Sequence, residues 1–93
     1  MIVKVNNEFI KICEEILAYN RNESEWAEYD ISDMFQTENY CGGFETIENE
    51  FTFSYYEDQN EYWFQLTLDD IKNIANGKIT EIEARPAELS KEN

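Results

Sequence analysis

The chain has 93 residues with 21 Asp or Glu, seven Lys or Arg and no His, so its formal net charge is −14. Nucleic acids and anionic membrane surfaces are negatively charged themselves, and this excess argues against both as direct ligands. A hydrophobic content of 42%, including 15% aromatic residues, is too high for a disordered acidic tail and predicts one folded domain.

The first predicted element is a helix over about residues 7–20. Asn6 or Asn7 can cap its N-terminus through the side-chain oxygen. Its apolar stripe follows the 3.6-residue period of an amphipathic helix. The stripe consists of Phe9, Ile10, Cys13, Ile16 and Leu17.

The segment 24–40 shows no clear periodicity. Ser32 and Asp33 can start a short helical turn that runs through Phe35. The glycine pair in residues 41–43 then predicts a turn or a bulged entry into a strand, because glycine allows a positive φ or a close backbone approach.

A β-hairpin over about residues 51–66 is the clearest structural pattern. A short strand over 44–47 is expected before it. Apolar and polar residues alternate through 51–56 and again through 62–67, as is typical of half-buried strands. The polar residues 57–60 have the length of a four-residue hairpin loop.

A second helix is predicted over about residues 68–76. Thr67 is expected as its N-cap, and Asp70 three residues later completes a pair similar to a capping box. An Asn-Gly pair stops this helix. A final strand over about 79–84 follows, and Pro86 ends it because proline has no backbone N–H to donate.

This order of elements predicts an α+β fold, with helices packed on one face of a short antiparallel sheet of 3–4 strands. Residues 1–86 form the predicted domain and residues 87–93 a polar C-terminal tail. Two cysteines are too few for a disulfide framework. Because we find neither a signal peptide nor an apolar run long enough to span a bilayer, we expect a cytoplasmic protein.

The residue types that catalysis and metal binding require are missing or occur in unsuitable patterns. Without His, no Ser-His or Cys-His arrangement exists, and zinc motifs are absent. Cys13 lies on the apolar helix stripe and is interpreted as a core thiol. Adjacent acids such as Asp69 and Asp70 suit a helix N-terminus. We therefore expect no enzymatic activity, no cofactor and no catalytic, cofactor-binding or metal-binding residues.

Aromatic residues occupy both faces of the predicted hairpin. If the Phe-rich set faces the core, Tyr56 and Trp63 point to the opposite face. Two interpretations follow. Either a loop or the segment 24–40 covers both rings, or they form an exposed patch among acids, as in protein–protein interfaces.

In the final strand, Glu81 and Glu83 share one parity and would form a row of carboxylates with a spacing of about 7 Å. Phosphates along a DNA strand have a similar spacing. We predict that a basic protein partner contacts this row together with the acids and outward aromatic residues of the hairpin. The predicted partner-binding residues are Tyr56, Glu57, Asp58, Glu61, Trp63, Glu81 and Glu83.

In size, charge, α+β layout and richness in Glu, Asp, Tyr and Asn, the chain resembles small acidic inhibitors of phages and mobile elements, of the anti-CRISPR and DNA-mimic types. This resemblance implies a non-enzymatic inhibitor on the basic nucleic-acid-binding surface of a bacterial nuclease or CRISPR effector. The chain also resembles cytoplasmic immunity proteins, which neutralise a cognate toxin. A third hypothesis is a small regulatory domain whose charge serves solubility only.

Overall fold

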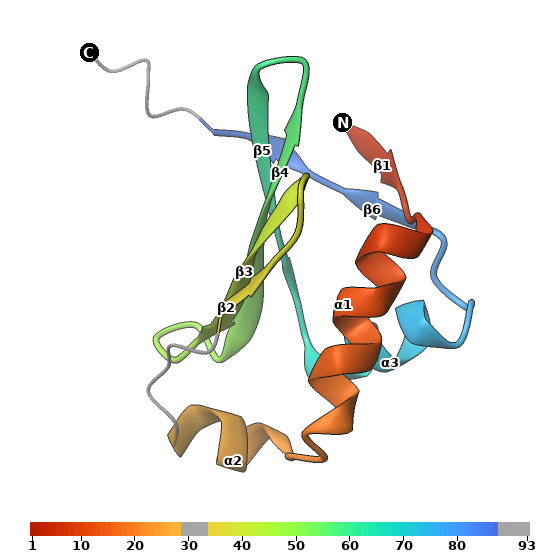
Figure 1. Cartoon of the computed structure of the whole chain (residues 1–93). Coiled ribbons are helices and arrows are strands. Elements are labelled where there is room, and N and C mark those ends of the chain that lie inside the picture. The colour runs from red at the N-terminus through yellow and green to blue at the C-terminus, as the bar shows by residue number, and fades with distance from the viewer. Residues whose placement is uncertain (29–33, 88–93) are drawn as a thin grey trace.

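Two antiparallel sheets and three helices form the part of the chain that the computed structural model describes, residues 1–28 and 34–87 (Figure 1). The predicted α+β class is confirmed. The elements in chain order are β1 (Ile2–Lys4), α1 (Asn7–Ala18), α2 (Glu23–Glu28), β2 (Met34–Gln36), β3 (Tyr40–Glu45), β4 (Glu50–Glu57), β5 (Asn60–Leu66), α3 (Leu68–Ala75), β6 (Glu81–Glu83) and β7 (Arg85–Pro86).

The larger sheet has five strands in the order β2-β3-β4-β5-β7, and β1 pairs with β6 in a separate two-stranded ribbon. The predicted number of 3–4 strands is therefore too low. Strands β1, β2 and β7 have three residues or fewer, which is too short for apolar alternation to be recognised. They form because neighbouring segments pair with them, not because their own sequence favours a strand.

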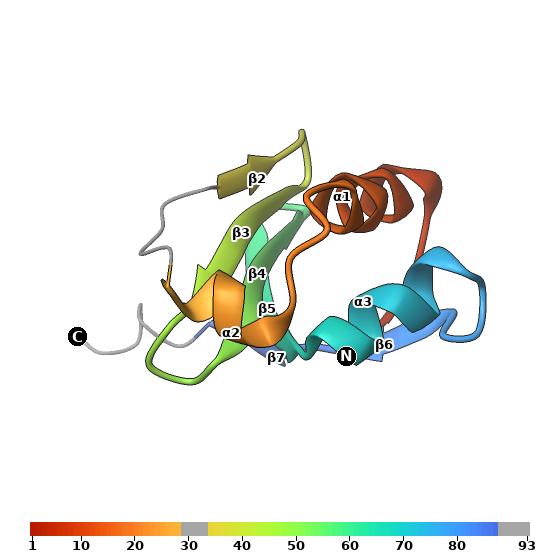
Figure 2. The same ribbon diagram turned by 90° about the horizontal axis from the view of Figure 1, so that it is seen from below.

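Helices α1 and α3 lie side by side against one face of the large sheet, as two perpendicular views show (Figures 1 and 2). The predicted α1 is confirmed, and Asn6 caps it by accepting a hydrogen bond from the Phe9 backbone N–H. Phe9 is fully buried, with ring centroids 4.8 Å from Tyr40, 5.1 Å from Phe53 and 5.5 Å from Phe64. Edge-on and tilted ring packing of this kind joins α1 to the sheet.

The Glu8 carboxylate, in the first turn of α1, forms a second link between α1 and the sheet. It accepts hydrogen bonds from the Thr37 hydroxyl and from the backbone and side-chain N–H groups of Asn39, which lie between β2 and β3. Burial acts to raise the pKa of Glu8, but these hydrogen bonds outweigh it and hold the pKa below its ordinary value. The ionised carboxylate therefore stabilises the fold.

The segment 24–40 differs from the prediction. Its start belongs to α2, where Trp26 is buried and packs against Phe51 with a centroid distance of 5.2 Å. Phe35 lies in β2 opposite Gly42, so the predicted helical turn through Phe35 is wrong. Pairing with β3 and burial beside Trp26 outweigh the local turn propensity. Ser32 and Asp33, the predicted start of that turn, lie outside the described residues.

The glycine pair lies inside β3 and forms neither a turn nor a strand entry, which corrects that prediction. A Cβ added to Gly42 would lie 2.1 Å from the Thr52 carbonyl oxygen and 2.7 Å from the Phe53 Cα atom. Close approach of two backbones therefore requires glycine here. The predicted strand over 44–47 is also wrong, because β3 ends at Glu45 and Ile47 is 84% exposed in the following turn.

The predicted hairpin is confirmed, with β4 and β5 in register from Phe51 opposite Leu66 to Glu57 opposite Asn60. Its connection is shorter than predicted. Residues 58–59 form a two-residue turn in which Asp58 has a φ of 53° and Gln59 a φ of 69°. Two positive φ values are typical of a tight turn whose twist matches that of the flanking strands.

The predicted second helix and its capping box are also confirmed, since the side chains of Thr67 and Asp70 each accept a hydrogen bond from the other's backbone N–H. The final strand is shorter than 79–84, because β6 covers only Glu81–Glu83. Pro86 does not end the strands: it lies in β7 opposite Tyr62, at the sheet edge where a missing N–H is tolerated.

We predict that Gly42→Ala lowers the free energy of unfolding by about 3 kcal/mol, because the new methyl group must displace the backbone of β4. Gly77→Ala is the matched control. Gly77 has a φ of 86° with no atom near an added Cβ, so backbone strain alone should cost about 1–2 kcal/mol. Urea unfolding measures both values. An equal loss in the two variants would contradict the close approach at Gly42.

We predict that Glu8→Gln lowers the free energy of unfolding at pH 7 by about 1–3 kcal/mol, because hydrogen bonds to a charged acceptor are lost. The pKa of Glu8 is lowered by folding, so its contribution is fully present above the ordinary carboxyl pKa. It disappears as the pH falls through the lowered value. Urea unfolding between pH 7 and pH 3 tests this, with Glu14→Gln, exposed on the same helix, as the control for charge.

Candidate protein-binding surface

The face of the five-stranded sheet that points away from α1 and α3 is called the outer face here. Among the described elements, no helix lies over it (Figure 2). Strand alternation and register place a mixed set of side chains on it. The described outer-face residues used below are Cys41, Ser54, Tyr56, Glu61, Trp63 and Arg85.

The two aromatic side chains predicted to point away from the core do so. Tyr56 is 43% exposed and Trp63 is half-buried. The described aromatic residues of the segment 24–40, Trp26, Phe35 and Tyr40, do not cover them, because all three are buried in the core. The outer face therefore presents one open ring and one partly covered ring.

Arg85 covers part of Trp63. The two residues are register partners between β5 and β7, and the Arg85 guanidinium carbon lies 5.0 Å from the centroid of the Trp63 ring. This is the geometry of a cation–π interaction. Sequence reasoning missed Arg85, because no local pattern indicates that a residue after β6 returns to pair with β5.

Glu61 is a neighbour of both Tyr56 and Trp63 on the outer face. Glu61 is the register partner of Tyr56 and precedes Trp63 by two residues on the same face of β5. Its Oε2 atom accepts a hydrogen bond of 3.1 Å from the Ser54 hydroxyl. This hydrogen bond holds the carboxylate of an exposed residue whose register partner is Tyr56.

The tip of the hairpin carries two further predicted acids, Glu57 and Asp58, and both are exposed. The Tyr55 hydroxyl donates a hydrogen bond of 3.1 Å to Glu57 Oε1. Burial, this hydrogen bond and the charge of Glu57 together raise the pKa of Tyr55. The hairpin thus brings together the predicted residues Tyr56, Glu57, Asp58, Glu61 and Trp63.

The other two predicted residues, Glu81 and Glu83, lie in the two-stranded ribbon. Both are exposed on either side of the buried Ile82, as the alternation predicts. Their register partners in β1 are Lys4 and Ile2. The nearby ammonium group of Lys4 offsets part of the negative charge of this row, so the ribbon is less acidic than the hairpin tip.

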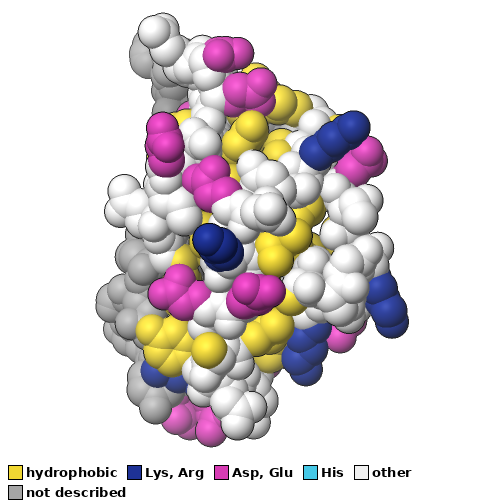
Figure 3. All heavy atoms as spheres, turned by 45° about the vertical axis from the view of Figure 1, so that its right-hand side comes forward, with side chains coloured by type: hydrophobic (Ala, Val, Ile, Leu, Met, Phe, Trp, Pro, Cys, Tyr) yellow, Lys and Arg dark blue, Asp and Glu magenta, His cyan; other side chains and the backbone are white. Residues whose placement is uncertain are grey.

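The net charge is concentrated in one part of the chain. Residues 22–71 contain 14 Asp or Glu and no Lys or Arg, whereas the rest of the chain contains seven acids and seven bases. That span includes α2 and strands β2 to β5. Figure 3 shows the side formed by α1, α3 and the ribbon, where basic side chains lie among acidic and hydrophobic ones. The molecule is therefore electrically polar: four described acids of this span lie on strands of the large sheet, three in its turns, three on α2 and two at the start of α3.

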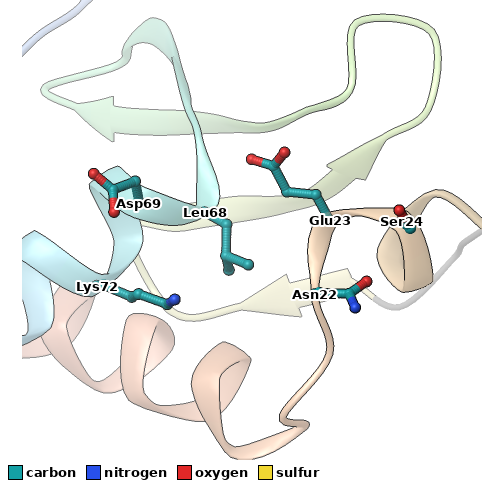
Figure 4. Close-up of a pocket in the computed structure, with 6 residues that line it drawn as sticks. All are labelled: Asn22, Glu23, Ser24, Leu68, Asp69 and Lys72. Carbon is teal, nitrogen blue, oxygen red and sulfur yellow. The ribbon is translucent and has the colours of Figure 1, made fainter.

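A shallow pocket of about 410 Å³ lies between α3 and the start of α2 (Figure 4). Its lining mixes both signs of charge around one apolar side chain. It consists of Asn22, Glu23, Ser24, Leu68, Asp69 and Lys72. The capping box of α3 already satisfies backbone N–H groups at that helix N-terminus. The pocket offers a ligand neither a uniform charge nor an apolar wall.

Both cysteines of the chain are free thiols. Cys13 is buried in the core as predicted, and burial, followed by the charge of Glu14, raises the pKa of its thiol to about 12. Cys41 is a half-buried free thiol. Within residues 1–28 and 34–87, no three Cys, Asp or Glu side chains are grouped so that they could hold a metal ion.

Comparisons with family models, with curated proteins and with solved structures found no significant match. The resemblance to acidic inhibitors therefore remains a prediction from sequence. None of the described helices is both long enough and apolar enough to cross a bilayer.

We predict that Arg85→Ala uncovers Trp63 and increases quenching of its fluorescence by acrylamide. The measurement needs a Trp26→Phe background, because the chain has two tryptophans. Within the described residues the Trp26 Nε1 atom has no hydrogen-bond partner, so this background removes none. Lys78→Ala removes another exposed cation and should leave quenching unchanged. Equal quenching with and without Arg85 would show that Arg85 does not shield the ring.

Proposed function

We propose that the protein is a non-enzymatic inhibitor in the cytoplasm, which binds the basic nucleic-acid-binding surface of a bacterial nuclease or CRISPR effector. The observation that carries the proposal is the concentration of all the net charge in residues 22–71, which build most of the large sheet. An exposed aromatic ring, Tyr56, lies on the same sheet beside carboxylates. Rings surrounded by polar residues are typical of binding hot spots.

In the proposed mechanism, carboxylates of the hairpin take the place of nucleic-acid phosphates against Lys and Arg of the partner. Glu57, Asp58 and Glu61 supply charge, while Tyr56 and Trp63 supply apolar contact. Glu81 and Glu83 contribute less, because Lys4 lies opposite Glu81. Long-range attraction accelerates association, and it weakens as salt shortens the Debye length from about 10 Å at 0.1 M to about 3 Å at 1 M.

The polarity of the molecule favours a binding surface over a charge that serves solubility only. Solubility depends on the net charge and does not require the acids to be separated from the bases. A directional field, by contrast, orients a protein as it approaches an oppositely charged partner. The immunity-protein alternative uses the same surface and differs in the partner, a cognate toxin, so the two are distinguished by identifying the protein that is bound.

The test is competition. The protein is used at low salt to capture basic nucleic-acid-binding proteins from host cells, and each captured protein is assayed for nucleic-acid binding and cleavage. We predict that wild-type protein blocks both, and that Glu57→Lys with Glu61→Lys weakens inhibition about tenfold or more. Glu14→Lys with Glu15→Lys is the matched control, since it makes the same change in net charge at exposed positions of α1.

Equal loss in the two double variants would mean that net charge alone matters and would overturn the role of the hairpin. Capture of a protein whose nucleic-acid binding is unaffected would overturn inhibition by occupation of that surface. A third variant, Glu81→Lys with Glu83→Lys, should weaken inhibition less than the hairpin variant, because Lys4 lies opposite Glu81.

A further inference from the structure

Both arginines of the chain lie over aromatic rings. The guanidinium carbon of Arg21 is 4.6 Å from the Tyr19 centroid and 4.7 Å from the Trp26 centroid. Arg85 lies over Trp63 on the outer face. A guanidinium stacks on a ring through its planar, weakly hydrated group, which an ammonium cannot match. The outer face thus already holds one arginine by this interaction.

A second ring with a carboxylate lies next to that occupied one. Tyr56, on β4, is 43% exposed, and its register partner on β5 is Glu61. The Ser54 hydroxyl holds the Glu61 carboxylate through a hydrogen bond of 3.1 Å. A flat ring and a fixed carboxylate together match the two binding modes of a guanidinium, stacking and paired N–H donation.

The surrounding charge favours a cation from outside the molecule. Residues 22–71 contain no Lys or Arg, Arg85 on the adjacent strand already lies over Trp63, and Glu57 and Asp58 at the hairpin tip add further negative charge. On the described strands of the large sheet, Arg85 is the one basic residue. The negative charge around Tyr56 therefore favours the binding of a basic partner.

We propose that Tyr56 and Glu61 form a receptor for an arginine side chain of the protein partner, beside the ring that Arg85 covers. The inference rests on the proposed function and specifies it: the surface distinguishes arginine from lysine and does not respond to positive charge alone. The ring supplies the stacking surface, and the carboxylate supplies the acceptor pair.

The test uses hexa-arginine and hexa-lysine peptides as probes, with affinities measured by isothermal titration calorimetry at one low salt concentration. We expect the wild-type protein to bind hexa-arginine about two- to five-fold more tightly than hexa-lysine, as for an exposed cation–π contact. Tyr56→Ala and Glu61→Gln should abolish this preference. Tyr56→Phe keeps the ring and should retain it.

Glu14→Gln removes one exposed acid from α1 and should leave the ratio of the two affinities unchanged, which controls for net charge. Circular dichroism of each variant controls for folding. Equal affinity of the wild-type protein for both peptides, or a preference that survives Tyr56→Ala, would overturn the receptor. Chemical-shift changes that centre on Tyr56, Glu61 and their strand neighbours should accompany binding of hexa-arginine.

The outcomes separate this inference from the proposed function. If the protein blocks a nuclease but shows no preference for arginine, the proposed inhibitory function is supported and the proposed arginine receptor is wrong. If the preference for arginine is present but no captured protein loses nucleic-acid binding, the arginine receptor is supported and the proposed mode of inhibition is wrong.

Discussion

The packing of Phe9 against the sheet is the contact on which the rest of the structure depends. Its ring lies within 5.5 Å of those of Phe53 and Phe64, so it fixes which face of β4 and β5 is covered by α1. Because side chains alternate along a strand, the same contact turns Tyr56 and Trp63 to the opposite face. The outer face is therefore a consequence of core packing.

The sequence separates into a nearly neutral part and a strongly acidic part, and the two meet between α2 and α3, where Glu23, Asp69 and Lys72 line one pocket. The acidic part builds α2 and β2 to β5, whereas residues 1–21 and the segment after residue 71 contain the bases. Repulsion between acids on a sheet costs stability. The fold offsets this cost with a dense aromatic core and with the Glu8 carboxylate, which is hydrogen-bonded to the connection between β2 and β3.

Local signals predicted the hairpin and α3, because alternation, capping and the Asn-Gly stop all act within a few residues. Long-range pairing decided the rest. Phe35 becomes part of a strand only because β3 lies beside it, and Gly42 is required by a backbone that follows it by about ten residues. The same distinction applies to the candidate site. The alternation of side chains along β4 predicted the face on which Tyr56 lies, but no local pattern predicted that Arg85 covers Trp63.

Pro86 has a consequence for self-association. It lies in β7, the last strand at that edge of the large sheet, and it has no N–H with which to bind another strand. A second copy that tries to extend the sheet there meets a missing donor, which disfavours edge-to-edge aggregation. Concentrated protein should therefore resist sheet growth from this edge.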